Sequence, residues 1–146
     1  MVNSEILKYA LKALARRDYS VVDLTTRLTE RFGDESRDVI RHLILKRLLD
    51  DRRVAAAYVR SRSNRGPARL REELARRGIP DPIIDEVLRR ADSPSLGDVL
   101  KARMTALGLR PPLDARSAAR LFRHLRSLGF EDETIREELE RFYEQQ

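Results

Sequence analysis

The sequence predicts an all-α protein, made of three tandem three-helix repeats that form an elongated, curved array. Apolar residues recur at helical spacing along the chain, and no segment shows the two-residue alternation of a β-strand. One pattern occurs three times, a pair of leucines at positions i and i+4: Leu24 and Leu28, Leu70 and Leu74, Leu121 and Leu125. Repetition of a helical unit is typical of an extended array rather than of an enzyme folded around one pocket.

The repeat continues beyond each leucine pair through one glycine and two aliphatic residues. These are Gly33, Val39 and Leu43 in the first copy, Gly78, Ile84 and Leu88 in the second, and Gly129, Ile135 and Leu139 in the third. We therefore predict three repeats over residues 1–49, 50–92 and 93–146. The turn-forming residues at 92–95 are the basis for the last boundary.

The first repeat begins with a helix whose buried stripe we expect to be Leu7, Leu11 and Leu14. Ser20 resembles the first residue of a capping box, so it opens a second helix that ends near Gly33. A third helix is predicted over 36–49. Its apolar residues are Val39, Ile40, Leu43, Ile44 and Leu48.

The second repeat opens at Asp50 and Asp51, because two acids favour the positive end of a helix dipole. The buried stripe of this helix is predicted to contain Val54, Ala55, Tyr58 and Val59. The segment 65–67 breaks the chain and starts the next helix, with proline in its first turn. That helix runs to Gly78, which ends it. The third helix opens at 80–82 and carries Ile83, Ile84, Val87 and Leu88.

The third repeat is expected to hold helices over 96–107, 114–128 and 131–143. Residues 108–112, which include two prolines, form a stiff linker between the first two.

Composition limits the possible partners and the compartment. The chain has 30 Lys and Arg against 24 acids, a net charge of +6, which favours a polyanion or an acidic protein surface as partner. The bases are nearly all arginine, which suits bidentate phosphate contacts but is equally explained by a GC-rich genome. The absence of cysteine excludes disulfides and fits a reducing cytoplasm, where we expect the protein to act. No apolar run or signal-peptide pattern indicates a membrane.

No group of residues predicts catalysis, a cofactor or a metal site. The two histidines, His42 and His124, lack partners at metal-ligand spacing. Adjacent acids such as Glu72 and Glu73 point about 100° apart on a helix, so they would not share a proton. No glycine-rich phosphate loop appears. We therefore expect a protein that is not an enzyme.

Arginines of the middle repeat form the best candidate binding surface. They fall on helix faces or at the turn that joins the first two helices of this repeat, and they are Arg53, Arg60, Arg62, Arg65, Arg69 and Arg76. Such a cluster could contact phosphates. The alternative is a solvated surface on which these arginines pair with glutamates, as the spacing of Arg69 and Glu73 permits.

Residues of the middle repeat also form a specific motif. Its members are Asp50, Asp51, Tyr58, Gly66, Leu70, Leu74 and Gly78. With the segments 13–24 and 119–130, this motif resembles the RecX family. The resemblance covers nearly the whole chain.

The resemblance implies a function. RecX proteins are bacterial cytosolic modulators, mostly inhibitors, of the recombinase RecA, and act in recombination, DNA repair and the SOS response. They are thought to lie in the groove of the RecA–DNA filament. We therefore expect a monomer whose partners are the RecA nucleoprotein filament and single- or double-stranded DNA. Two alternatives remain: a stand-alone basic DNA-binding protein and a purely protein-binding helical adaptor.

Overall fold

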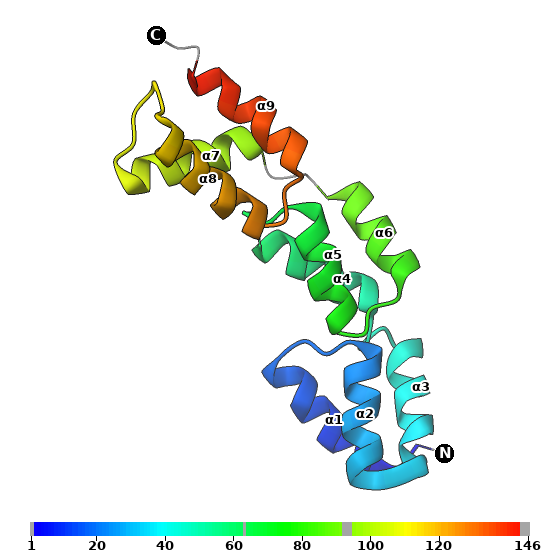
Figure 1. Ribbon diagram of the computed structural model, residues 1–146. Coiled ribbons are helices and arrows are strands. Elements are labelled where there is room, and N and C mark those ends of the chain that lie inside the picture. The colour runs from blue at the N-terminus through cyan, green and yellow to red at the C-terminus, as the bar shows by residue number, and fades with distance from the viewer. Residues whose placement is uncertain (1, 63, 92–94, 144–146) are drawn as a thin grey trace. The chain divides into compact units, whose positions relative to one another are not determined.

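The structure is a computed structural model that describes residues 2–62, 64–91 and 95–143, and every regular element within them is helical (Figure 1). The predicted all-α class is confirmed. The elements are α1 (Ser4–Arg16), α2 (Val21–Phe32), the 3₁₀ turn η1 (Gly33–Ser36), α3 (Arg37–Leu45), α4 (Asp51–Ser61), α5 (Pro67–Arg76), α6 (Asp81–Arg90), α7 (Leu96–Leu107), α8 (Ala115–Ser127) and α9 (Asp132–Tyr143).

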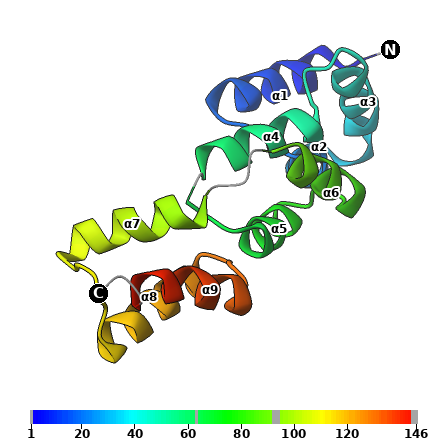
Figure 2. The ribbon, with the colours of Figure 1, turned by 90° about the horizontal axis from the view of Figure 1, so that it is seen from above.

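The chain divides into two compact units. The N-terminal unit comprises residues 1–60 and 73–90, and the C-terminal unit comprises residues 61–72 and 91–146. In the C-terminal unit, α7 contacts both α8 and α9 (Figure 2). The predicted repeat boundary between 92 and 93 lies outside the described residues. None of the described helices is long and apolar enough to cross a membrane.

The repeated residues have the same structural role in each copy. The six leucines of the three pairs are at most 3% exposed. The glycines that follow all have positive φ, at 72° for Gly33, 81° for Gly78 and 95° for Gly129. At Gly78 a side chain is also excluded, because a Cβ atom would lie 2.7 Å from Val22 Cβ. This glycine therefore ends α5 and admits α2 to close contact.

The buried stripe of α1 differs from the prediction. Leu11 is 40% exposed, and the fully packed residues are Ile6, Ala10 and Ala13. Leu7 and Leu14 are partly buried at the edge of the same core. The two alanines lie on the core face although they add little apolar surface, because small side chains allow neighbouring helices to approach closely.

The predicted third helix of the first repeat was too long. It ends at Leu45, where Lys46 and the left-handed Arg47 (φ 57°) turn the chain. The amides of Leu48 and Leu49 both donate to the Leu43 carbonyl, at 2.9 and 3.2 Å. Leu48 is exposed in this turn, and Ile44 is exposed although it lies within α3, so neither is in the core.

The C-terminal unit has a separate apolar core. Leu100, Met104, Leu121, Leu125, Ile135 and Leu139 are its best-buried members. The helices agree closely with the predicted ranges, and α7 matches its range at both ends. Side chains cap their starts: Ser95 Oγ accepts the Asp98 amide at 3.3 Å, and Asp114 Oδ1 accepts the Ser117 amide at 2.7 Å.

Candidate partner-binding surface

The double-aspartate motif is part of the internal structure of the N-terminal unit. Asp50 Oδ1 accepts the backbone N–H of Arg52 at 3.0 Å and so caps α4. Asp51 is only 8% exposed, and its Oδ1 accepts the N–H of Val21 at 2.8 Å. Burial raises the pKa of Asp51, against the lowering effect of the Val21 N–H and with smaller raising effects from Asp50 and Asp23. This carboxyl group therefore joins the start of α4 to the start of α2.

Ser20 fixes the same helix start from another direction. Its Oγ accepts the Asp23 N–H at 3.0 Å, which confirms the predicted cap. The same hydroxyl donates to the Arg77 carbonyl at 2.5 Å, beyond the end of α5. The start of α2 is thus bonded to both α4 and the segment after α5.

Tyr58 is a packing residue with a polar end. Its ring is 9% exposed, and its hydroxyl donates to a carboxylate oxygen of Glu73. The Arg77 guanidinium lies 4.5 Å from the ring centroid, within the range of a cation–π contact. The tyrosine therefore joins α4 to α5 within the N-terminal unit.

Two of the six candidate arginines hold backbone carbonyls of their own chain. The Arg53 guanidinium donates to the carbonyls of Arg47 and Leu48, at 2.8 and 3.2 Å, and so closes the turn after α3. Arg69 is half-buried, and its Nη1 donates to the Ser127 carbonyl at 2.7 Å. Both contacts depend on turns that the helical periodicity does not describe.

The other four candidates divide between the units. Arg60 and Arg76 are exposed in the N-terminal unit, and Arg62 and Arg65 are half-buried in the C-terminal unit. The Arg65 amide donates to the Arg62 carbonyl at 3.1 Å, which forms a turn before Gly66.

Gly66 of the motif permits a close approach of two backbone segments. Its N–H donates to the Leu128 carbonyl at 2.6 Å, at the end of α8. A Cβ atom at this position would overlap the carbonyl of Gly129. The glycine is therefore needed for packing in the C-terminal unit.

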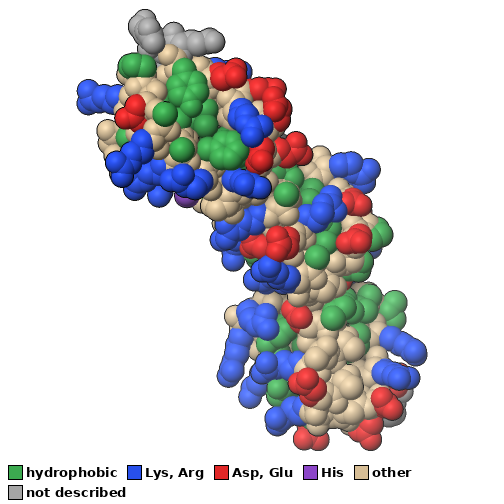
Figure 3. All heavy atoms as spheres, in the orientation of Figure 1, with side chains coloured by type: hydrophobic (Ala, Val, Ile, Leu, Met, Phe, Trp, Pro, Cys, Tyr) green, Lys and Arg blue, Asp and Glu red, His purple; other side chains and the backbone are tan. Residues whose placement is uncertain are grey.

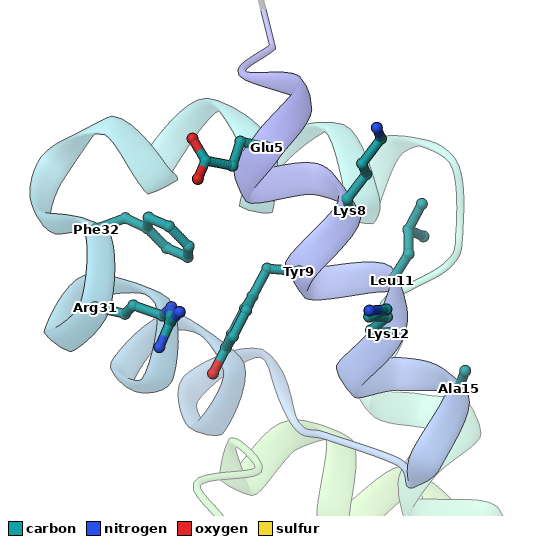
Figure 4. Close-up of a pocket in the computed structure, with 8 residues that line it drawn as sticks. All are labelled: Glu5, Lys8, Tyr9, Leu11, Lys12, Ala15, Arg31 and Phe32. Atoms are coloured by element: carbon teal, nitrogen blue, oxygen red, sulfur yellow. The ribbon is translucent and has the colours of Figure 1, made fainter.

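Sequence analysis missed a basic and aromatic groove on the first repeat. It has a volume of about 560 Å³ and lies beside α1 and the end of α2 (Figure 4). Tyr9 and Phe32 form its aromatic wall, with ring centroids 5.3 Å apart and nearly perpendicular planes. The Arg31 guanidinium lies 4.7 Å from the Tyr9 centroid, and Lys8 and Lys12 line the rim. The i,i+4 spacing of the lysines was the available signal.

A second missed feature is the outer face of α8. Arg116, Arg120 and Arg123 are exposed there, opposite the buried Ala118 and Leu121. Figure 3 shows Lys and Arg side chains gathered along one edge of the C-terminal unit. The arginines' spacing of four and three residues was the available signal, because it places all three on one face of a helix.

Comparisons with known proteins agree on one family. Residues 50–88 match the family described as RecX, second three-helix domain. A regulatory protein RecX from Halorhodospira halophila is 37% identical over 131 residues, which cover 87% of this chain and 81% of that relative. A regulatory protein RecX from Chlorobium phaeobacteroides is 32% identical over 139 residues, covering 92% and 91%. The crystal structure of RecX from Lactobacillus salivarius superposes with a TM-score of 0.73 at 20% identity, covering 94% and 96%.

Proposed function

The chain belongs to the RecX family, and from this premise we propose that it binds the RecA–DNA filament and lowers the recombinase and ATPase activity of RecA. It acts without catalysis of its own, as a monomer in the cytoplasm, in recombination, DNA repair and the SOS response. The observation that carries the proposal is the similarity to regulatory RecX proteins over most of the chain.

The charge of the chain supports a filament as partner. A net charge of +6 favours association with a polyanionic assembly. Asp51 and Tyr58 are buried, so we propose that exposed cations make the contacts with the filament. Among the candidates of the middle repeat, Arg60 on α4 is exposed and lies within the segment that matches the family.

The activity test measures ATP turnover and DNA strand exchange by RecA while this protein is added. We expect both rates to fall when the protein is present at well below one copy per RecA, as an effect that propagates along a filament requires. Unchanged rates at equal concentrations of the two proteins would refute the proposal.

Charge reversal tests the contact surface. Arg60→Glu should weaken binding to filaments formed with a non-hydrolysable ATP analogue, by roughly tenfold, because an attractive contact becomes repulsive. Arg89→Glu on α6 is the matched control, since Arg89 is exposed in the same unit but lies beyond the matched segment. Equal affinities of the two variants would move the contact surface elsewhere. Arg69 is unsuitable for this test because it holds the Ser127 carbonyl.

A stand-alone DNA-binding protein is the second candidate, favoured by the exposed arginines of α8. Fluorescence anisotropy with labelled single-stranded DNA separates the two functions. Binding that tightens strongly only with assembled RecA supports the filament regulator. Equal, salt-sensitive binding without RecA supports the second candidate.

A further inference from the structure

The basic and aromatic groove of the first repeat lies within the N-terminal unit, beside α1 and the end of α2 (Figure 4). It contains an apolar strip formed by Leu11 and Ala15, which are one helical turn apart on α1 and both exposed. Leu11 is 40% exposed, so the core of the unit does not cover it. A single exposed leucine is ordinary on a protein surface, but one that lies inside a groove can pack against an apolar side chain of a partner.

Three cations surround this apolar strip. Lys8 and Lys12 lie on α1, Arg31 lies on α2, and all three are exposed. Among the described lining residues the acidic one is Glu5, in the first turn of α1, so the groove carries a net positive charge.

The cations of the groove have no carboxylate partners in the described part of the chain. No ion pair involves Lys8, Lys12 or Arg31 there, whereas Arg52 and Arg90 on the same unit both pair with Glu86, at 3.0 and 3.5 Å. Two like charges at positions i and i+4 also repel each other along a helix. Carboxylates from outside would relieve this repulsion between the lysines and pair with cations that the chain itself leaves unpaired.

The aromatic wall is held by contacts within the unit. The Arg31 guanidinium lies 4.7 Å from the Tyr9 centroid and 5.6 Å from the Phe32 centroid. Arg27 Nε donates to the Tyr9 hydroxyl at 3.2 Å. The rings are therefore engaged with each other and with guanidinium groups, whereas stacking of nucleobases needs a free ring face.

We propose that this groove docks an acidic peptide segment of a protein partner. Carboxylates of the segment pair with Lys8, Lys12 and Arg31, and an apolar side chain of the segment packs against Leu11 and Ala15. A peptide fits better than a nucleic-acid strand, because the sugar–phosphate backbone has no aliphatic side chain to cover the apolar strip. The site is separate from the arginines of the middle repeat and goes beyond the function proposed above.

Peptide probes test both parts of the site in the whole protein by fluorescence anisotropy. The first is a fluorescein-labelled peptide in which glutamates flank a central leucine, the second has serine in place of leucine, and the third has glutamine in place of every glutamate. We expect the serine peptide to bind about fourfold more weakly than the leucine peptide, because Leu11 loses an apolar contact. The glutamine peptide should not bind. Equal affinities of the leucine and serine peptides, or no binding of the leucine peptide, would overturn the proposal.

Variants at exposed positions locate the binding. Lys12→Gln should weaken binding of the leucine peptide by about threefold, as expected for one exposed ion pair. Lys46→Gln is the matched control, since Lys46 is exposed at the end of α3 in the same unit and does not line the groove. Equal weakening by the two variants would show diffuse attraction and overturn the site.

Leu11→Ser tests the apolar contact. It should weaken binding of the leucine peptide by about fourfold and leave binding of the serine peptide unchanged, because the contact between the two side chains is already absent there. Weakening of both peptides to the same extent would contradict the assigned contact.

A labelled single-stranded oligonucleotide with the same number of charges tests the other class of partner. Its affinity should be the same for Leu11→Ser and the wild type. If Leu11→Ser weakens the oligonucleotide as much as the leucine peptide, the groove is a nucleic-acid site and the peptide assignment is overturned. None of these measurements contains RecA, so their failure and the failure of the RecA activity test are distinguishable.

Discussion

At the scale of single residues, several side chains that could be contact groups instead hold the repeats together. Asp51 shows this most clearly, since its carboxylate accepts the Val21 amide across two helix starts. Replacement by alanine would leave a part-buried N–H without its acceptor. Such a loss is worth about 1–3 kcal/mol.

We therefore expect Asp51→Ala to lower the free energy of unfolding by about 2 kcal/mol and Asp51→Asn, which retains an acceptor oxygen, to lower it less. Urea unfolding measures both. Because the folded-state pKa of Asp51 is raised, the native state binds the extra proton between the unfolded and folded pKa values. As pH falls through this window, the free energy of unfolding of the wild type should therefore increase relative to that of Asp51→Asn. An opposite pH trend would contradict the assigned burial effect.

Gly78 offers a second residue-scale test. Alanine there must adopt a φ of 81° and place its Cβ 2.7 Å from Val22 Cβ. Gly108 is the control, since it has a left-handed conformation but nothing within 4 Å of an added Cβ. Gly108→Ala should cost about 1–2 kcal/mol from backbone strain alone. Gly78→Ala should cost about 1–3 kcal/mol more in thermal or urea unfolding, because its neighbourhood is overpacked.

Periodicity predicted some residues well and others poorly, for a physical reason. The leucine pairs and glycines were predictable because helical spacing alone determines which side chains face inward and where a helix ends. The roles of Arg53 and Arg69 were not, because their acceptors are carbonyls of Arg47, Leu48 and Ser127. Those carbonyls are brought near by turn conformations and tertiary packing that spacing does not encode.

At the scale of elements, the turn after α3 shows how local backbone conformation and side-chain hydrogen bonds end a helix. Leu45 is 81% exposed where the chain leaves α3, although the apolar pattern continues to Leu49. The sequence period therefore predicted a longer helix than the structure contains. The left-handed Arg47 and the two hydrogen bonds from Arg53 fix the turn instead.

Because Arg53 bonds to this turn, we expect substitutions at two arginines of α4 to differ in their effect on stability. Arg53→Met should lower the free energy of unfolding by about 1 kcal/mol, because two exposed hydrogen bonds to carbonyls are lost. Arg60→Met, with the same change on an exposed position of the same helix, should stay within about 0.5 kcal/mol of wild type. Urea unfolding of the two variants compares them. Equal stabilities would show that the Arg53 bonds are replaced by water without loss.

At the scale of the whole molecule, the excess of bases is distributed over repeats rather than gathered in the middle one. The first repeat has a groove rimmed by Lys8 and Lys12, and the third has the arginine row on α8. The predicted candidate set around Arg60 was based on helix faces and on one turn of the middle repeat, so it covered that repeat alone. Several motif residues pack inside the protein or bond to its own groups, as Asp51, Tyr58 and Gly66 show.

Because the bases are distributed in this way, the salt dependence of nucleic-acid binding should report how many phosphates the chain contacts. For single-stranded DNA, the logarithm of the binding constant should fall with the logarithm of salt concentration at about 0.7 per phosphate contacted. Anisotropy titrations at several salt concentrations measure this slope for the whole chain. Arg120→Gln and Arg123→Gln should each reduce the slope by about 0.7.

Arg141→Gln provides the matched control for the slope, because Arg141 is exposed in the same unit but pairs with Glu138 at 3.4 Å. Its slope should equal that of wild type. If all three variants reduce the slope equally, the attraction follows net charge rather than position. If the wild-type slope is close to zero, the positive charge of this chain serves a protein surface, and the nucleic acid in the filament is contacted only by RecA.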